Sequence, residues 1–111
     1  MAEIPRNRDV DIQSRDYWFK VVEMLQQNWA LIDPVADSTN FCVFFFGDTG
    51  GIFDRLILPT RQEAECALRR NGFRRYDEDV EAQKFLFNPS LPFREQSHPN
   101  GRIYSSGRFW R

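Results

Sequence analysis

The chain has 111 residues, of which 41% are hydrophobic and 15% are aromatic, and its net charge at pH 7 is −1. This length predicts one domain, no apolar run approaches the roughly 20 residues of a membrane span, and the aperiodic glycines and prolines exclude a collagen-like chain. The near balance of basic and acidic residues excludes a protein drawn as a whole to nucleic acid or membranes. We therefore expect a soluble cytoplasmic protein.

The start of the chain, residues 1–13, is polar and charged. Because it lacks the apolar core of a secretory signal, we expect a loose N-terminal arm. We expect an α+β domain over residues 14–88 and an extended tail over residues 89–111. The tail is basic and aromatic, and its apolar side chains suggest that it docks on the domain.

Four apolar side chains early in the domain recur at the i, i+4, i+7 and i+11 spacing of a helix: Trp18, Val22, Leu25 and Trp29. Ser14 precedes them and belongs to a residue type that caps helices. This pattern predicts a helix over residues 15–29 whose apolar face lies on a sheet. A short strand is expected next, over residues 29–33.

The strongest strand signal is the aromatic run over residues 40–46. The run is apolar on both faces, which is typical of a central strand covered on both sides. A turn over residues 47–51 and an apolar run over residues 52–58 complete a predicted β-hairpin. The first helix would cover one face of this hairpin. The other face would need the tail, a second copy of the chain or a foreign partner.

Thr60 and Glu63 have the spacing of a capping box. They predict a helix that continues to about Arg70 and stops at Gly72. The apolar face of this helix is small and consists of Ala64, Ala67 and Leu68.

An extended segment is expected to begin near residues 73–76. Alternation over residues 83–87 predicts a further strand, with Phe85 and Phe87 on one side in the core. The expected order is α-β-β-β-α-β. A last strand is added if the tail pairs with the sheet. This order favours an α+β fold, a small two-layer domain with a mostly antiparallel sheet and helices on one face.

The segment Asp48-Thr49-Gly50 follows the most apolar strand and resembles the catalytic loop of aspartic proteases. The resemblance implies a dimeric acid protease in which the Asp48 side chains of two copies share one proton. Gly47 and Gly51 depart from the residues usual beside this motif, and a helix over residues 60–70 departs from a nearly all-β protease. A polar hairpin turn explains the same residues, so Asp48 is a weak catalytic candidate.

The residues that bind metals and cofactors are scarce. One histidine, His98, and two cysteines, Cys42 and Cys66, match no zinc spacing and make no disulfide framework. We expect no metal and no cofactor. Cys42 is expected in the core, and Cys66 is expected on the exposed side of its helix.

Arginine accounts for 13 of the 15 basic residues and lies beside aromatic residues in two places. Arg, Trp and Tyr are enriched at protein-binding hot spots, and Arg with aromatic residues also suits single-stranded nucleic acid. The expected binding residues are Arg69, Arg70, Arg74, Arg75, Arg102, Tyr104, Arg108, Phe109 and Trp110. The acidic run over residues 77–81 is expected to neutralise part of this cluster.

We predict a small non-enzymatic protein that acts through protein–protein contact, with a foreign partner or with itself as a homodimer. The alternative is a nucleic-acid-binding module that uses Arg and aromatic residues. The third hypothesis is the dimeric protease acting through Asp48.

Overall fold

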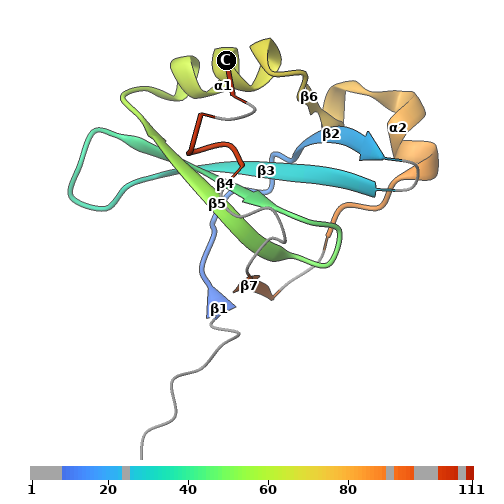
Figure 1. Cartoon of the computed structure of the whole chain (residues 1–111), viewed down its shortest axis with the longest axis horizontal. Helices are drawn as coiled ribbons and strands as arrows, with labels where there is room; N and C mark the ends of the chain where they lie inside the picture. Colours follow the sequence, from blue (N-terminus) through green and yellow to red (C-terminus); the bar gives the residue numbers. More distant parts are fainter. Residues whose placement is uncertain (1–8, 24–25, 90–91, 97–102, 108–109) are drawn as a thin grey trace, which may run out of the picture.

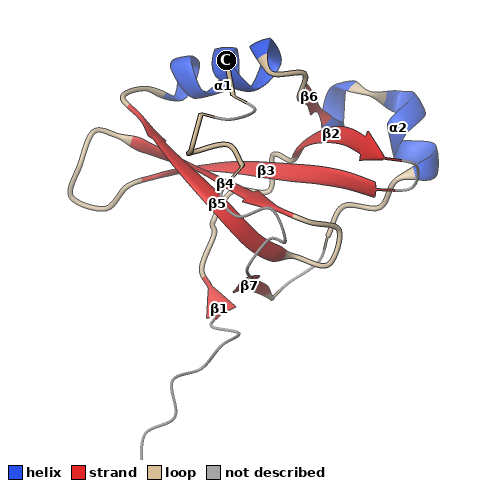
Figure 2. Cartoon of the chain, in the orientation of Figure 1, coloured by secondary structure: helices blue, strands red, loops and turns tan. Residues whose placement is uncertain are grey.

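The computed structural model describes residues 9–23, 26–89, 92–96, 103–107 and 110–111 (Figure 1). These residues form a mixed seven-stranded sheet with two α-helices, which is an α+β fold (Figure 2). In chain order the elements are β1 (Asp9–Val10), β2 (Trp18–Glu23), β3 (Gln26–Pro34), β4 (Phe41–Phe46), β5 (Gly51–Leu58), α1 (Arg61–Arg70), β6 (Arg74–Arg75), the 3-10 turn η1 (Tyr76–Glu78), α2 (Val80–Phe85) and β7 (Phe93–Glu95).

The centre of the sheet is an antiparallel meander of β2, β3, β4 and β5. β7 pairs in parallel with β5, and β1 pairs with β7 at the outer edge. β6 pairs with β2 at the opposite edge. The strand order is therefore β1-β7-β5-β4-β3-β2-β6.

The helix predicted over residues 15–29 is wrong, because this stretch contains β2 and the start of β3. Trp18 and Phe19 are adjacent, and both are buried because they belong to cores on opposite faces of the sheet. In the observed register they lie opposite Ala30 and Trp29. Cross-strand packing of aromatic side chains stabilises the hairpin, and this tertiary gain overrides the helical spacing.

Of the other two members of the helical stripe, Val22 is exposed and Leu25 lies outside the described residues. The strand expected over residues 29–33 is present as part of the longer β3.

The two faces of the sheet support separate cores. The first core lies beneath α1, and its buried members are Trp18, Ala30, Ile32, Val43, Phe45, Ala64, Leu68, Phe73, Ile103 and Tyr104. The second core contains Ile12, Tyr17, Phe19, Trp29, Leu31, Phe46, Ile52 and Phe93. β4 contributes to both cores, which confirms that the aromatic strand is covered on both sides.

The chain covers both faces of its sheet with its own segments. Figure 1 shows α1 and the C-terminal segment on one side of the sheet and β1 and β7 toward the other. Ile103 and Tyr104 join the first core, whereas Ile12 and Phe93 fill the second. The second face was expected to need the tail, another copy or a partner. Among the described residues it is filled by residues 11–17 and by Phe93 of β7, which belongs to the tail.

The local predictions in the middle of the chain are confirmed. The β4–β5 hairpin forms as expected, and α1 begins where the capping box predicts it. Thr60 Oγ1 accepts a hydrogen bond from Glu63 N at 3.0 Å. Gly72 adopts a φ of +88° just after the helix, a conformation that favours glycine.

The strand predicted over residues 83–87 is wrong, because residues up to Phe85 belong to α2. Asp79 caps this short helix by accepting a hydrogen bond from Ala82 N at 3.0 Å. Ala82 packs against the second core, so the two helices contact different cores. The expectation that both helices lie on one face is therefore wrong as well.

Candidate functional site

Arg75 is held by ion pairs inside the chain. Its Nη2 lies 2.9 Å from Asp16 Oδ2 and 3.0 Å from Glu65 Oε2. Burial acts to lower the pKa of the guanidinium, but the charges of Asp16 and Glu65 outweigh it and raise the pKa above its usual value. The guanidinium carbons of Arg75 and Arg69 lie 5.0 Å and 4.9 Å from the ring of Trp18. These contacts join β2, β6 and α1.

The neighbouring arginines pair with the acidic run. Arg69 Nη2 lies 3.0 Å from Glu78 Oε1, and Arg74 Nη1 lies 3.4 Å from Asp79 Oδ2. Binding to nucleic acid needs cations that are available to neutralise its phosphates. Arg69, Arg74 and Arg75 instead pair with carboxylates of their own chain.

Tyr104 and Trp110 of the tail pack on the sheet. The ring centroid of Tyr104 lies 4.5 Å from that of Phe45, and its hydroxyl accepts a hydrogen bond from Asn28 Nδ2 at 2.7 Å. Burial raises the pKa of Tyr104, and the hydrogen bond from Asn28 lowers it in part. Trp110 lies 5.4 Å from Phe45 and 5.6 Å from Tyr104. Both aromatic residues therefore contact the first core.

Arg70 also makes a contact within the chain. Its Nε donates a hydrogen bond to the backbone oxygen of Arg111 at 3.2 Å. Asn71 makes two hydrogen bonds to the same residue. Its Oδ1 accepts one from Arg111 N at 2.6 Å, and its Nδ2 donates one to the backbone oxygen of Arg111 at 3.1 Å. Three other expected binding residues lie outside the described part of the chain: Arg102, Arg108 and Phe109.

Two buried carboxylates accept hydrogen bonds from the backbone of segments that are distant in sequence. The sequence patterns did not indicate either of them. Asp54 Oδ2 accepts hydrogen bonds from the backbone N–H groups of residues 104–105 at 2.8 Å and 2.7 Å. Asp33 accepts from the N–H groups of residues 13–14 at 2.7 Å and 2.8 Å. The signal that could have revealed them is an aspartate inside an otherwise apolar strand, because a buried carboxylate requires donors.

Asp48, the weak catalytic candidate, contacts β3. Its Oδ1 accepts a hydrogen bond from Trp29 Nε1 at 2.8 Å, and its Oδ2 accepts from Gln27 N at 3.2 Å. Both oxygens thus tie the β4–β5 turn to the neighbouring strand. This anchoring accounts for an aspartate in the turn without catalysis.

The two cysteines lie in different surroundings, and they should react differently with thiol reagents. Cys42 is buried and Cys66 is exposed. Burial raises the pKa of Cys42 to about 11, so its reactive thiolate form is scarce at pH 8. We expect Ellman's reagent at pH 8 to modify one thiol per native chain quickly and the second only after unfolding. Cys66→Ser should remove the fast phase, and a fast phase that persists in this variant would contradict the assignment.

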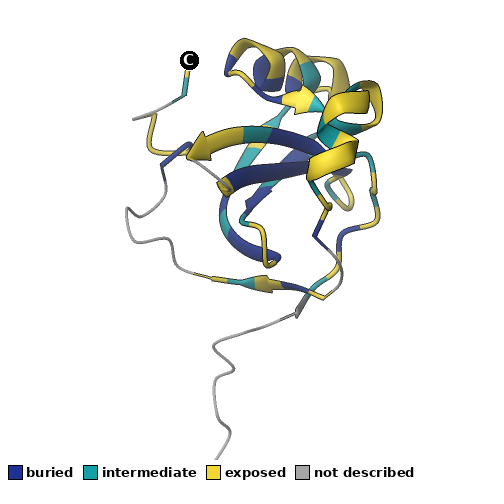
Figure 3. Cartoon of the chain, turned by 90° about the vertical axis from the view of Figure 1, so that its right-hand side faces the viewer, coloured by how far each residue is buried: buried dark blue, intermediate teal, exposed yellow. Residues whose placement is uncertain are grey.

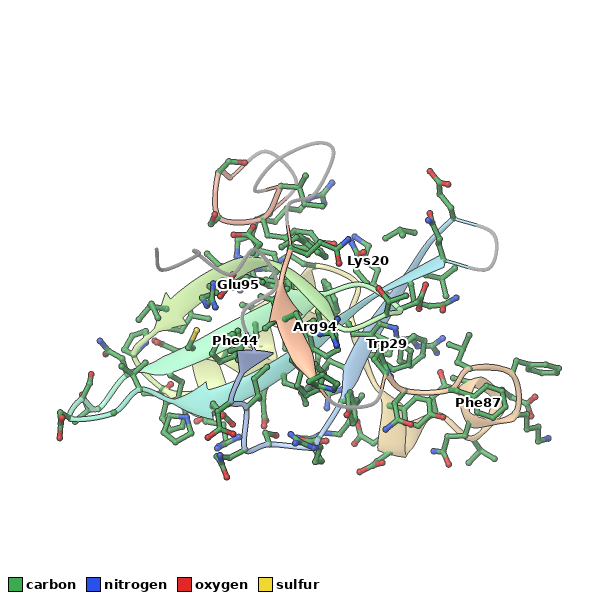
Figure 4. All side chains as sticks on the ribbon, turned by 90° about the horizontal axis from the view of Figure 1, so that it is seen from below. Lys20, Trp29, Phe44, Phe87, Arg94 and Glu95 are labelled. Atoms are coloured by element: carbon green, nitrogen blue, oxygen red, sulfur yellow. The ribbon has the colours of Figure 1, made fainter. Side chains whose placement is uncertain are left out.

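Three large apolar side chains around α2 are exposed: Val80, Phe85 and Phe87, with exposed fractions of 66%, 76% and 86%. We call them the α2 ridge. In Figure 4, Phe87 lies at the periphery of the molecule, far from Phe44 at the sheet. The sequence alternation predicted that Phe85 and Phe87 lie on one side of a core strand, but both rings are exposed to solvent.

The backbone segment that carries Phe85 and Phe87 is anchored to the rest of the domain. Leu86, between the two ridge phenylalanines, packs against the second core, and its backbone oxygen accepts a hydrogen bond from the Tyr76 hydroxyl at 2.6 Å. The Tyr17 hydroxyl donates to the backbone oxygen of Pro89 at 2.9 Å. Anchors on both sides of Phe87 thus hold the exposed rings on a defined backbone.

No family model, curated protein or solved structure matches this chain closely enough to show a relationship. Within the part of the chain that the structure describes, no group of three or more His, Cys, Asp or Glu side chains is placed to hold a metal ion. His98 lies outside that part. No helix among the described residues is both long and apolar enough to cross a membrane.

Proposed function

We propose that this chain is a non-enzymatic protein-interaction module whose contact surface is the α2 ridge. The observation that supports this proposal is the exposure of Phe85 and Phe87 on an anchored backbone, at 76% and 86%. Leaving two phenylalanine rings in water forgoes about 2–3 kcal/mol of burial each. A partner that covers them recovers this free energy.

The anchoring of the ridge favours binding further. Leu86 and Pro89 are held by tyrosine hydroxyls, so the backbone around Phe87 loses little freedom when a partner docks. Interfaces concentrate their binding energy in a few aromatic side chains that enter pockets. Pre-organised anchors of this kind bind more tightly because the ordering cost is already met by folding.

Charge around the ridge indicates the chemistry of the partner. Asp77 and Glu81 are exposed and lie within three positions of Val80 in the sequence, and Lys84 Nζ lies 3.3 Å from Glu81 Oε1. A partner surface that fits is an apolar groove with Lys or Arg at its rim. A second α2 ridge would instead bring acidic side chains against acidic side chains, so we assign the ridge to a foreign protein.

Replacing both ridge phenylalanines, Phe85→Ser with Phe87→Ser, should abolish partner capture while leaving the fold intact. The measurement is quantitative mass spectrometry of proteins retained by the tagged chain from its native host, followed by calorimetry with the purified partner. We expect retention to fall by at least about tenfold, because each truncated hot spot costs about 2 kcal/mol or more.

Ile57→Ser is the matched control, because Ile57 is also a large exposed apolar residue, at 56%, but lies on β5. It should retain the partner as the native chain does. Equal retention by the ridge variant and the native chain would contradict the proposal, and so would loss of the partner in the Ile57 variant alone.

A further inference from the structure

The outer edge of β2 is only partly paired. β6 covers Trp18 and Phe19, and no described strand pairs with the same edge over residues 20–23. Figure 3 shows this end of β2 passing from buried to exposed toward its tip. The edge therefore offers unpaired backbone groups, which can template pairing with another strand.

The apolar side chains of this edge are exposed, and the half-buried Lys20 side chain lies beside Gly72. Val21 and Val22 are 58% and 42% exposed, far more than most valines in folded proteins. Among the described residues, Lys20 and Glu23 take part in none of the observed ion pairs. The edge thus presents two apolar side chains between a lysine and a glutamate that form no ion pair with other described residues.

A β-bulge places Lys20 and Glu23 on the same face of β2. Lys20 lies opposite Asn28, and Glu23 lies opposite Gln26, with the register shift between Val21 and Glu23. Asn28 and Gln26 are two residues apart on β3 and share a face. Residues directly opposite in a sheet also share a face, so Lys20 and Glu23 lie on one face together.

We propose that this edge pairs antiparallel with the same edge of a second copy of the chain. A two-fold axis normal to the sheet would pass between Val21 and Val22 and keep the faces of both sheets aligned. Lys20 then lies opposite Glu23 of the second copy, and Val21 lies opposite Val22 of the second copy. By symmetry each contact occurs twice, so the segment Lys-Val-Val-Glu is complementary to itself in charge and in hydrophobicity.

The resulting dimer is small and reversible, because only four residues of each edge meet and the bulge limits regular hydrogen bonding. It goes beyond the proposed function and uses a different surface. Two α2 ridges would belong to one dimer, which lets a partner with repeated grooves bind with avidity. Failure of the dimer would leave the binding of a partner to the ridge unaffected.

Two single charge reversals and their mixture test the pairing. Lys20→Glu places two acidic residues opposite each other, and Glu23→Lys places two basic residues opposite each other. Each variant alone should self-associate about tenfold more weakly than the native chain. When the two variants are mixed, every contact again joins opposite charges, so a heterodimer should form. Sedimentation velocity over a dilution series and native mass spectrometry of the mixture measure both effects.

The double ridge variant, Phe85→Ser with Phe87→Ser, separates this surface from the α2 ridge. It should dimerise as the native chain does. A monomeric native chain at every concentration, or no heterodimer in the mixture, would overturn the proposal. Dimerisation that is lost in the ridge variant but unchanged by the charge reversals would overturn it as well.

Discussion

Phe45→Ala is expected to lower the free energy of unfolding by about 3–5 kcal/mol, the usual cost of emptying a fully buried phenylalanine site. Phe45 is wholly buried on β4, and among the described residues the rings of Phe73, Tyr104 and Trp110 pack against it. These rings come from different parts of the chain, and rigid aromatic side chains do not collapse into a void of this size. The loss is a large fraction of the 5–15 kcal/mol that stabilises a typical domain.

Urea unfolding followed by tryptophan fluorescence measures this loss. Phe85→Ala is the matched control, because the same atoms are removed from a side chain that is 76% exposed. It should change the stability by less than about 0.5 kcal/mol. Similar losses in the two variants would contradict the assignment of Phe45 to the core and of Phe85 to the surface.

Asp54→Ala is expected to cost about 2–4 kcal/mol, because it removes the charged acceptor from the buried N–H of Tyr104 and from the partly buried N–H groups of Ser105 and Arg55. The Asp54 carboxylate is 3% exposed, and its Oδ2 holds the amides of residues 104–105 at 2.8 Å and 2.7 Å. Without it the tail detaches more readily from the first core. Asp54→Asn keeps the shape and one oxygen acceptor, so its loss should be smaller.

Native-state hydrogen exchange identifies the mechanism. The amides of Tyr104 and Ser105 should exchange much faster in Asp54→Ala, whereas amides of the second core should change only as far as global stability does. Asp77→Ala, which removes an exposed carboxylate, is the control and should leave these amides protected. Unchanged protection of Tyr104 in Asp54→Ala would refute the anchoring role.

The candidate binding residues show how far local patterns reach. Arg69, Arg75 and Trp110 were expected to bind because their residue types are common at interfaces. In the folded chain, Arg75 pairs with Asp16, 59 positions earlier, and Trp110 packs on Phe45. Partners this distant in sequence cannot be read from composition. The α2 ridge was missed for the same reason, since alternation tells which side chains share a side but not what covers that side.

The sequence by itself determined the β4–β5 hairpin, the capped helix α1 and its glycine stop. Those features depend on turn residues, capping side chains and β-branched or aromatic runs that act within a few positions. Only the tertiary structure decided the secondary structure of residues 15–29 and 80–87. Their apolar spacing satisfies a helix or a strand equally well, and the choice depended on packing in the folded chain: β2 packs against Ala30 and Trp29 of β3, and α2 packs against the second core. Because burial is a property of the assembled chain, only the fold could show that Phe45 is interior while Phe85 and Phe87 face solvent.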